Sequence, residues 1–327
     1  MKKIFVHLIT TRVKNKSVIS LFILGVLFLF LFVFFKSTLA QDISLGVSPP
    51  ILEVMIKPGK EINQKYLISN SGRETPLLLK IVPFSPQDAY GNVKFEDMSV
   101  YENIDLLSWF KIGDSPISNN ARIFLPRGGN QEITLNINPP ENAPQGDYYL
   151  TLLFETDLSN TIGKQGSSSN AQIGTNILLT ISKDGNPKKD AEVSEFSAPK
   201  IIDSLGTITY TLNIKNIGNA FFKPVGDITV NPSFGSDEKL TIAPLNILAS
   251  SVREIPCTQD EQLVRCTLPK KVFFGIYHAK LKFTLDDGSQ SYEASTLTFA
   301  FPFSIAIAFV VVLILIKIIT STLKRQY

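Results

Sequence analysis

Residues 207–214 (Thr-Ile-Thr-Tyr-Thr-Leu-Asn-Ile) alternate polar and apolar side chains, which predicts a β-strand with one buried face. Residues 131–137 and 275–285 alternate in a similar way. Turn-forming residues separate such runs, as in residues 70–72 (Asn-Ser-Gly) and 286–288 (Asp-Asp-Gly). Many short strands at this spacing predict antiparallel β-sandwiches, so we expect an all-β fold.

Two stretches of this region occur twice, in the same order. Residues 66–72 match residues 212–218 at Ile, Asn and Gly, and residues 146–154 match residues 275–283 at Gly, Tyr, Leu and Phe. The shared Asn-x-Gly should end an early strand in a tight turn with left-handed backbone, and the shared Gly-x-Tyr should open a late strand. Two matches in order predict tandem related domains.

We therefore expect two tandem immunoglobulin-like β-sandwich domains, residues 41–181 and residues 191–298. Residues 182–190 between them are polar apart from one proline ring, which is the composition of a linker. Trp109 and Phe110 are the largest candidates for the core of the first domain, and burial there is a more frequent role for Trp than stacking on a ligand.

The first 40 residues have the composition of an export signal. Basic residues precede an apolar run, residues 18–35, and small residues lead up to Ala40. This pattern predicts a signal peptide, residues 1–40, cleaved before Gln41. The apolar run is longer than a usual signal core, so an uncleaved signal-anchor helix is the alternative.

The other end of the chain carries a second apolar segment. Residues 295–316 contain no charged side chain, and basic residues follow them. We expect a transmembrane helix over residues 299–320 and a cytoplasmic tail, residues 321–327. The basic flanks at both ends agree that residues 41–298 lie outside the cytoplasm. The expected location is the cell membrane, with a single pass after signal cleavage.

Composition excludes several classes of function. A formal net charge of +3 over 327 residues argues against nucleic acid as a partner. A Ser-His-Asp or Cys-His system would need His278, the only histidine after the predicted signal, and strand alternation places it on a polar face. We therefore expect no enzyme, no catalytic residues, no metal and no cofactor. Paired carboxylates from distant strands are the one catalytic arrangement that sequence spacing leaves open.

Cys257 and Cys266 are the only cysteines, and both lie in the predicted extracytoplasmic region. Because that compartment is oxidising, we expect a local disulfide across a hairpin tip at residues 258–261. The alternative, a metal or redox pair, lacks an obvious third ligand. The Gly/Ser/Asn-rich residues 159–170 predict a solvated connection, with a binding loop as the alternative.

The order of these parts resembles that of the WxL-interacting surface proteins of Gram-positive bacteria. The resemblance covers nearly the whole chain and includes Pro-Gly-Lys at residues 58–60 before residues 66–72, and Pro-Pro at residues 139–140 before residues 146–149. It implies two immunoglobulin-like modules on a membrane anchor that bind peptidoglycan and host ligands. The first module alone also resembles the N-terminal module of pilus chaperones, and residues 212–218 resemble CARDB-type adhesion modules.

The expected function is therefore non-enzymatic binding at the cell surface. The partners would be a cell-wall polymer or another exported protein, with the membrane engaged through the C-terminal helix. Exposed sheet edges could pair with a strand of a partner. The alternative is a membrane-tethered chaperone or a subunit of an extracytoplasmic assembly. An enzyme, the third hypothesis, would need a pocket of convergent carboxylates.

Overall fold

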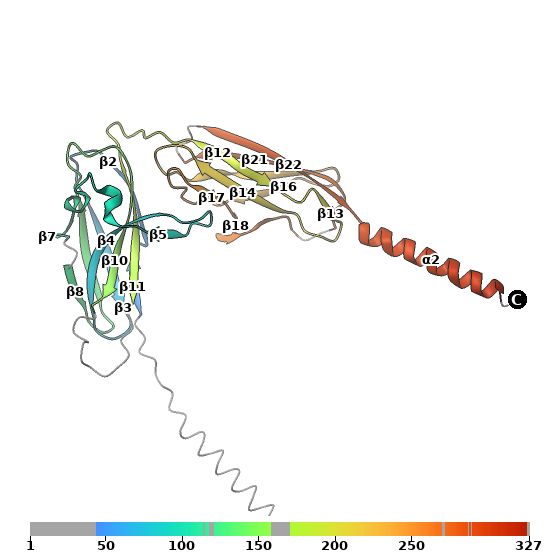
Figure 1. Cartoon of the computed structure of the whole chain (residues 1–327), viewed down its shortest axis with the longest axis horizontal. Helices are drawn as coiled ribbons and strands as arrows, with labels where there is room; N and C mark the ends of the chain where they lie inside the picture. The colour runs from blue at the N-terminus through green and yellow to red at the C-terminus, as the bar shows by residue number, and fades with distance from the viewer. Residues whose placement is uncertain are drawn as a thin grey trace, which may run out of the picture. The chain divides into compact units, whose positions relative to one another are not determined.

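The computed structural model describes residues 44–113, 115–117, 121–157, 171–269, 272–286, 288 and 290–325. The predicted signal, residues 1–40, and the Gly/Ser/Asn-rich residues 159–170 lie outside this range. Within it the chain is mostly β-strand, with one apolar helix at its C-terminal end (Figure 1). Leu45–Tyr327 forms one compact unit, and its described strands make four sheets.

Two of these sheets contain residues 45–181, which we call the N-terminal sheet pair. One sheet has the strand order β1 (Leu45–Ser48), β3 (Ile62–Asn70), β9 (Asn130–Ile137), β6 (Phe110–Ile112) and β7 (Ser115–Pro116). The other has the order β2 (Ile51–Ile56), β11 (Gln172–Ile181), β10 (Gly146–Thr156), β4 (Thr75–Pro86) and β5 (Val93–Phe95), with β8 (Ala121–Leu125) also paired to β4. Two 3-10 turns, Met98–Tyr101 and Leu106–Trp109, connect strands.

The other two sheets contain residues 191–301, the C-terminal sheet pair. One has the order β12 (Ala191–Ser197), β14 (Thr209–Asn216) and β17 (Val252–Glu254), with β20 (Cys266–Thr267) also paired to β14. The other has the order β13 (Ile201–Asp203), β22 (Ser291–Phe301), β21 (Gly275–Leu285), β15 (Pro224–Pro232), β16 (Glu238–Ile242), β18 (Cys257–Gln259) and β19 (Gln262–Val264). Helix α2 (Phe303–Arg325) follows.

The two sheet pairs share one strand topology. In each, the first strand (β1 or β12) pairs antiparallel with β3 or β14. The second strand (β2 or β13) belongs to the other sheet and pairs parallel with the last strand, β11 or β22. That last strand pairs with β10 or β21, which in turn pairs with β4 or β15. The repeated sequence stretches therefore lie at equivalent places in a repeated topology.

Each sheet pair buries its own hydrophobic cluster. Trp109, 2% exposed, and Phe110, fully buried, lie in the N-terminal cluster, as predicted. Phe273 and Phe283 are fully buried in the C-terminal cluster. Burying an aromatic or aliphatic side chain of this size stabilises a fold by about 1.5–3 kcal/mol, so each cluster is a substantial source of stability.

The Asn-x-Gly repeat makes the same hydrogen bond in both sheet pairs. The Asn70 side-chain oxygen accepts from the Gly72 N–H at 2.9 Å, and that of Asn216 accepts from the Gly218 N–H at 2.9 Å. The expectation of a left-handed glycine was wrong, because neither glycine has a positive φ. A Cβ on Gly218 would instead come within 2.6 Å of the Lys188 carbonyl oxygen, so close approach of the chain requires glycine there.

The Gly-x-Tyr repeat opens β10 and β21, as predicted. Gly146 (φ 142°) and Gly275 (φ 89°) have positive φ. The Tyr148 hydroxyl donates to the Pro144 carbonyl oxygen at 2.9 Å, and the Tyr277 hydroxyl oxygen accepts from the Phe274 N–H at 3.2 Å. Each tyrosine is therefore bonded back to the backbone that precedes its strand.

Residues 182–190 have no regular structure but are bonded at both ends. The Ser182 N–H donates to the Ile56 carbonyl oxygen at 3.1 Å. The Asn219 N–H donates to the Lys188 carbonyl oxygen at 2.8 Å, and the Ile217 N–H donates to that of Asp190 at 3.0 Å. The predicted linker is thus attached to both sheet pairs.

The last strand extends further than expected. The boundary at residues 298 and 299 lies inside β22, which continues to Phe301 before α2 begins at Phe303. The cause is pairing on both sides, because β13 and the first residues of β21 hydrogen-bond to this segment. Pro302 then ends the strand and suits the start of a helix. Phe303–Thr322, 20 residues, is long and apolar enough to cross a membrane.

Candidate functional site at the junction of the sheet pairs

A small apolar cluster joins the two sheet pairs. Phe84, Tyr149 and Leu178 come from β4, β10 and β11, and Leu248 comes from the chain between β16 and β17. The rings of Phe84 and Tyr149 stack with their centroids 5.9 Å apart. This cluster excludes water from the polar groups beside it, which strengthens their hydrogen bonds.

Asp147 and Tyr149 project from β10 toward this junction. The Asp147 carboxylate accepts hydrogen bonds from the Tyr149 hydroxyl at 2.6 Å, the Thr180 hydroxyl at 2.7 Å and the Phe221 N–H at 2.6 Å. The Tyr149 hydroxyl oxygen accepts from the Ala249 N–H at 2.8 Å. Burial raises the pKa of Asp147, although these hydrogen bonds oppose the shift. Burial, with the charge of Asp147, also raises the pKa of Tyr149.

Glu53 makes a second polar connection. Its carboxylate oxygens accept from the Lys223 ammonium at 2.6 Å and from the Asn246 side-chain amide at 2.6 Å. Burial alone would raise the pKa of Glu53, but the hydrogen bonds from these two side chains outweigh burial and lower the pKa. The outer face of β2 is therefore tied to the C-terminal sheet pair.

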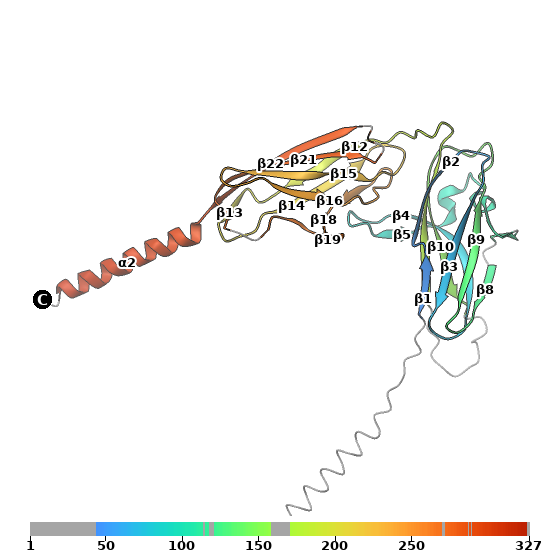
Figure 2. The same cartoon turned by 180° about the vertical axis from the view of Figure 1, so that it is seen from behind.

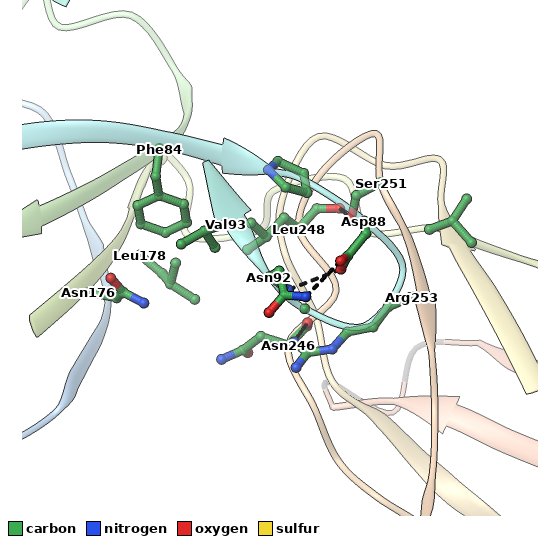
Figure 3. Close-up of a pocket in the computed structure, with 13 residues that line it drawn as sticks. Phe84, Asp88, Asn92, Val93, Asn176, Leu178, Asn246, Leu248, Ser251 and Arg253 are labelled. Atoms are coloured by element: carbon green, nitrogen blue, oxygen red, sulfur yellow. Dashed lines mark hydrogen bonds between the residues drawn. The ribbon is translucent and has the colours of Figure 1, made fainter. Parts of the chain in front are cut away.

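A cavity of about 170 Å³ lies at this junction (Figure 3). Its apolar lining includes Phe84, Val93, Leu178 and Leu248, and its polar lining is Asp88, Asn92, Asn176, Asn246, Ser251 and Arg253. The loop between β4 and β5 forms one wall. Its shape is held by the Asp88 carboxylate, which accepts from the Asn92 side-chain amide at 2.7 Å and from the Tyr90 N–H at 2.9 Å.

Arg253 lines the cavity from β17. The next residue, Glu254, connects β17 to the β4–β5 loop, because its N–H donates to the Ala89 carbonyl oxygen at 2.7 Å. The Arg253 guanidinium donates through Nη1 to the Asn246 carbonyl oxygen. A Cβ on Gly91 would lie 2.5 Å from Nη2, so glycine admits the guanidinium under the loop. Burial lowers the pKa of Arg253.

Two polar atoms, each on a residue that lines the cavity, are buried and lack a hydrogen-bond partner among the described residues. They are Nε of Arg253, a donor, and Oδ1 of Asn246, an acceptor. Buried polar atoms are nearly always paired, so each such atom requires an explanation. A peptide group carries one acceptor and one donor, the two kinds of partner that these atoms lack.

The lining does not form a catalytic arrangement. Among the described lining residues there is no histidine or cysteine, and the Ser251 hydroxyl donates to the Leu248 carbonyl oxygen at 2.7 Å. The one carboxylate, Asp88, is engaged in its own loop. A nucleophile next to a base is therefore missing from the cavity. The volume is also below the ~300 Å³ of small-molecule sites, so it fits a side chain or a short piece of backbone.

The residues singled out by sequence lie outside this cavity. Cys257 and Cys266 form the predicted disulfide, beside the β18–β19 hairpin, whose turn residues Asp260 and Glu261 have positive φ. His278 lies in β21, opposite Asn231 and Leu297. Sequence reasoning missed the junction because its residues come from segments far apart in the chain and share no motif.

Comparisons with known proteins give structural likenesses alone. No protein-family model matches the chain, and no curated protein matches it. A solved chaperone–tip adhesin complex of CFA/I fimbriae biogenesis is similar at 13% identity over 78% of this chain and 98% of that chain, with a TM-score of 0.38. The E. coli chaperone DraB is similar at 10% identity over 78% and 99%, with a TM-score of 0.36. The CsuC–CsuE chaperone–tip adhesion subunit complex of Acinetobacter baumannii is similar at 9% identity over 79% and 99%, with a TM-score of 0.35. Because these TM-scores are low, we draw the function from the chain's own residues.

Proposed function

We propose that the chain is a membrane-tethered, non-enzymatic protein-binding component of an extracytoplasmic assembly. The observation that carries this proposal is the junction cavity, where the lining residues Arg253 and Asn246 carry a buried donor, Nε, and a buried acceptor, Oδ1, without a hydrogen-bond partner within the described residues. Apolar walls surround this pair, and the volume suits a segment of polypeptide. The partner is therefore another exported protein, bound in part through a peptide group or an amide side chain.

The binding unit would be two tandem immunoglobulin-like β-sandwich domains, residues 41–181 and residues 191–298. Three observations support this assignment: the shared strand topology, the separate hydrophobic clusters, and the two tyrosines bonded back to preceding backbone. A tyrosine in that position and with that bond is a hallmark of immunoglobulin-like sandwiches. The junction contacts would fix one domain against the other.

The membrane tether would be α2. Its predominantly apolar stretch Phe303–Thr322, 20 residues at about 1.5 Å each, spans about 30 Å, which is the thickness of the hydrocarbon core of a bilayer. Lys324 and Arg325 lie at its C-terminal end, after the apolar stretch, so the proposed orientation places the sheet pairs outside the cytoplasm, with a single pass after signal cleavage. The resemblance to WxL-interacting proteins stays a prediction. Binding to a wall polymer is one possible outcome of the test below.

Photocrosslinking from the rim of the cavity tests the proposal in the intact membrane protein. Tyr90, 73% exposed, lies in the β4–β5 loop between the lining residues Asp88 and Gly91. A photoreactive phenylalanine analogue at position 90 should link one defined exported protein. The matched control is the same analogue at Phe124, 56% exposed in β8, which should link far less of that protein.

Two results would count against the proposal. Equal linkage of the same protein from both positions would place binding away from the cavity. Saturable binding to purified wall polymer, with no protein crosslinked from position 90, would favour the hypothesis that the chain binds the cell wall.

A further inference from the structure

The end of the C-terminal sheet pair next to α2 exposes large apolar side chains. Ile201, Ile276 and Phe299 lie side by side on adjacent strands β13, β21 and β22 and are 41–64% exposed. Phe234 and Phe274, from two loops at the same end, have ring centroids 5.9 Å apart. Contiguous exposed apolar surface of this kind marks an interaction site.

The outward side chains of β21 and β22 change from charged to apolar along the strands. The pair Lys282 and Glu293 forms an ion pair at 3.1 Å. The next outward pairs are Lys280 with Ser295, then His278 with Leu297, and finally Ile276 with Phe299. Successive pairs are about 7 Å apart along the strands, so polarity disappears over about 20 Å. The apolar end is the one from which α2 leaves.

The connection between this surface and α2 is short and bonded. Phe301 ends β22, and its ring centroid lies 5.0 Å from that of Phe303 at the start of the helix. The Asp203 carboxylate accepts from the Ser304 N–H at 2.7 Å and from the Ser304 hydroxyl at 2.8 Å. Figures 1 and 2 both show β13 beside the first turn of α2.

We propose that this end of the C-terminal sheet pair docks into the surface of the lipid bilayer, with Phe234, Phe274, Ile276 and Phe299 in the interfacial layer. The inference rests on the proposed membrane span of α2. Exposed Phe and aliphatic side chains bury into the boundary between lipid headgroups and acyl chains, and this surface is continuous with a helix of spanning length. Because Asp203 caps that helix, the sheets cannot move far from the bilayer without breaking these bonds.

Tryptophan quenching in reconstituted vesicles tests this docking with the full chain. The lipids carry bromine near the headgroup end of their acyl chains. The test variant is Phe274→Trp, 52% exposed, and the matched control is Phe124→Trp, 56% exposed in the N-terminal sheet pair. The native Trp109 is buried in that sheet pair, so its emission is measured in the unsubstituted protein and subtracted. A third variant, Phe309→Trp, reports on α2 itself.

Docking predicts that the emission from position 274 falls at least about twofold in brominated vesicles, while that from position 124 does not change. If position 309 is quenched and position 274 is not, the span is correct and the docking is wrong. If neither is quenched, the proposed span itself fails, and the docking fails with it.

Discussion

The Tyr149 hydroxyl donates a 2.6 Å hydrogen bond to the carboxylate of Asp147, two positions earlier on the same strand. Both side chains also bond the C-terminal sheet pair, because Asp147 accepts from the Phe221 N–H and Tyr149 accepts from the Ala249 N–H. Alternate residues of a strand face the same side, so β10 presents both groups together. One strand thus supplies two of the polar bonds between the two sheet pairs.

Asp147→Asn should destabilise the protein by about 1–3 kcal/mol, because an amide cannot accept at both ends and leaves a buried donor unpaired. Urea unfolding of the full chain in detergent measures this free energy. Asp105→Asn is the matched control, since Asp105 is exposed and its side chain makes no capping bond to the turn that follows. It should cost less than about 0.5 kcal/mol. If both variants lose the same free energy of unfolding, the hydrogen bonds of Asp147 do not stabilise the junction.

Two junction carboxylates should show opposite pH dependence. Burial raises the pKa of Asp147 above 3.8, so between the unfolded and the folded pKa the folded chain holds a proton that the unfolded chain has lost. Its contribution to stability therefore grows as the pH falls toward 3.8. For Glu53, burial is outweighed by hydrogen bonds that lower the pKa below 4.5, so its contribution is present above 4.5 and is lost as the pH falls.

Unfolding free energies measured across a pH series test whether the two contributions change in opposite directions. The difference between the unsubstituted protein and Asp147→Asn should shift in favour of the unsubstituted protein on acidification. The difference between the unsubstituted protein and Glu53→Gln should shrink. Parallel slopes for the two differences would show that one of these environments is assigned incorrectly.

Asn216 should matter more to stability than an exposed asparagine. Its side-chain amide donates to the Ala220 and Ile247 carbonyl oxygens, both at 2.9 Å, and its oxygen accepts from Gly218. Asn216→Ala leaves these buried groups unpaired and should lower the unfolding free energy by about 2–3 kcal/mol. Asn63→Ala, at an exposed position, should change it by less than about 0.5 kcal/mol. Thermal unfolding of both variants gives the comparison, and similar losses would contradict this role.

The disulfide between Cys257 and Cys266 should add about 2–3 kcal/mol, because it closes a short loop in the unfolded chain. A reducing agent should therefore lower the Tm of the full chain. The variant with serine at both positions should begin at the lower Tm and show no further change on reduction. A Tm that reduction leaves unchanged in the unsubstituted protein would contradict the assignment.

Strand alternation predicted β9, β14 and β21 because each has one face in a core and one face in water. The Gly-x-Tyr repeats predicted the starts of β10 and β21 because this motif sets a local backbone conformation. The junction had no such signal. β10 is buried on both faces over most of its length, so its alternation is hidden, and nothing in the sequence near Asp147 indicates a bond to a residue 74 positions away.

The most direct test of the account is the effect of Arg253→Lys on crosslinking from position 90. Lysine keeps the positive charge but removes the Nε–H donor, which the account assigns to the partner's backbone or amide oxygen. Lysine also loses the Nη1 bond to the Asn246 carbonyl oxygen, so urea unfolding of the same variant must show that it still folds cooperatively. We expect the yield of the crosslinked exported protein to fall about tenfold, which corresponds to about 1.4 kcal/mol of binding free energy. An unchanged yield in a stable variant would show that the cavity does not bind the partner.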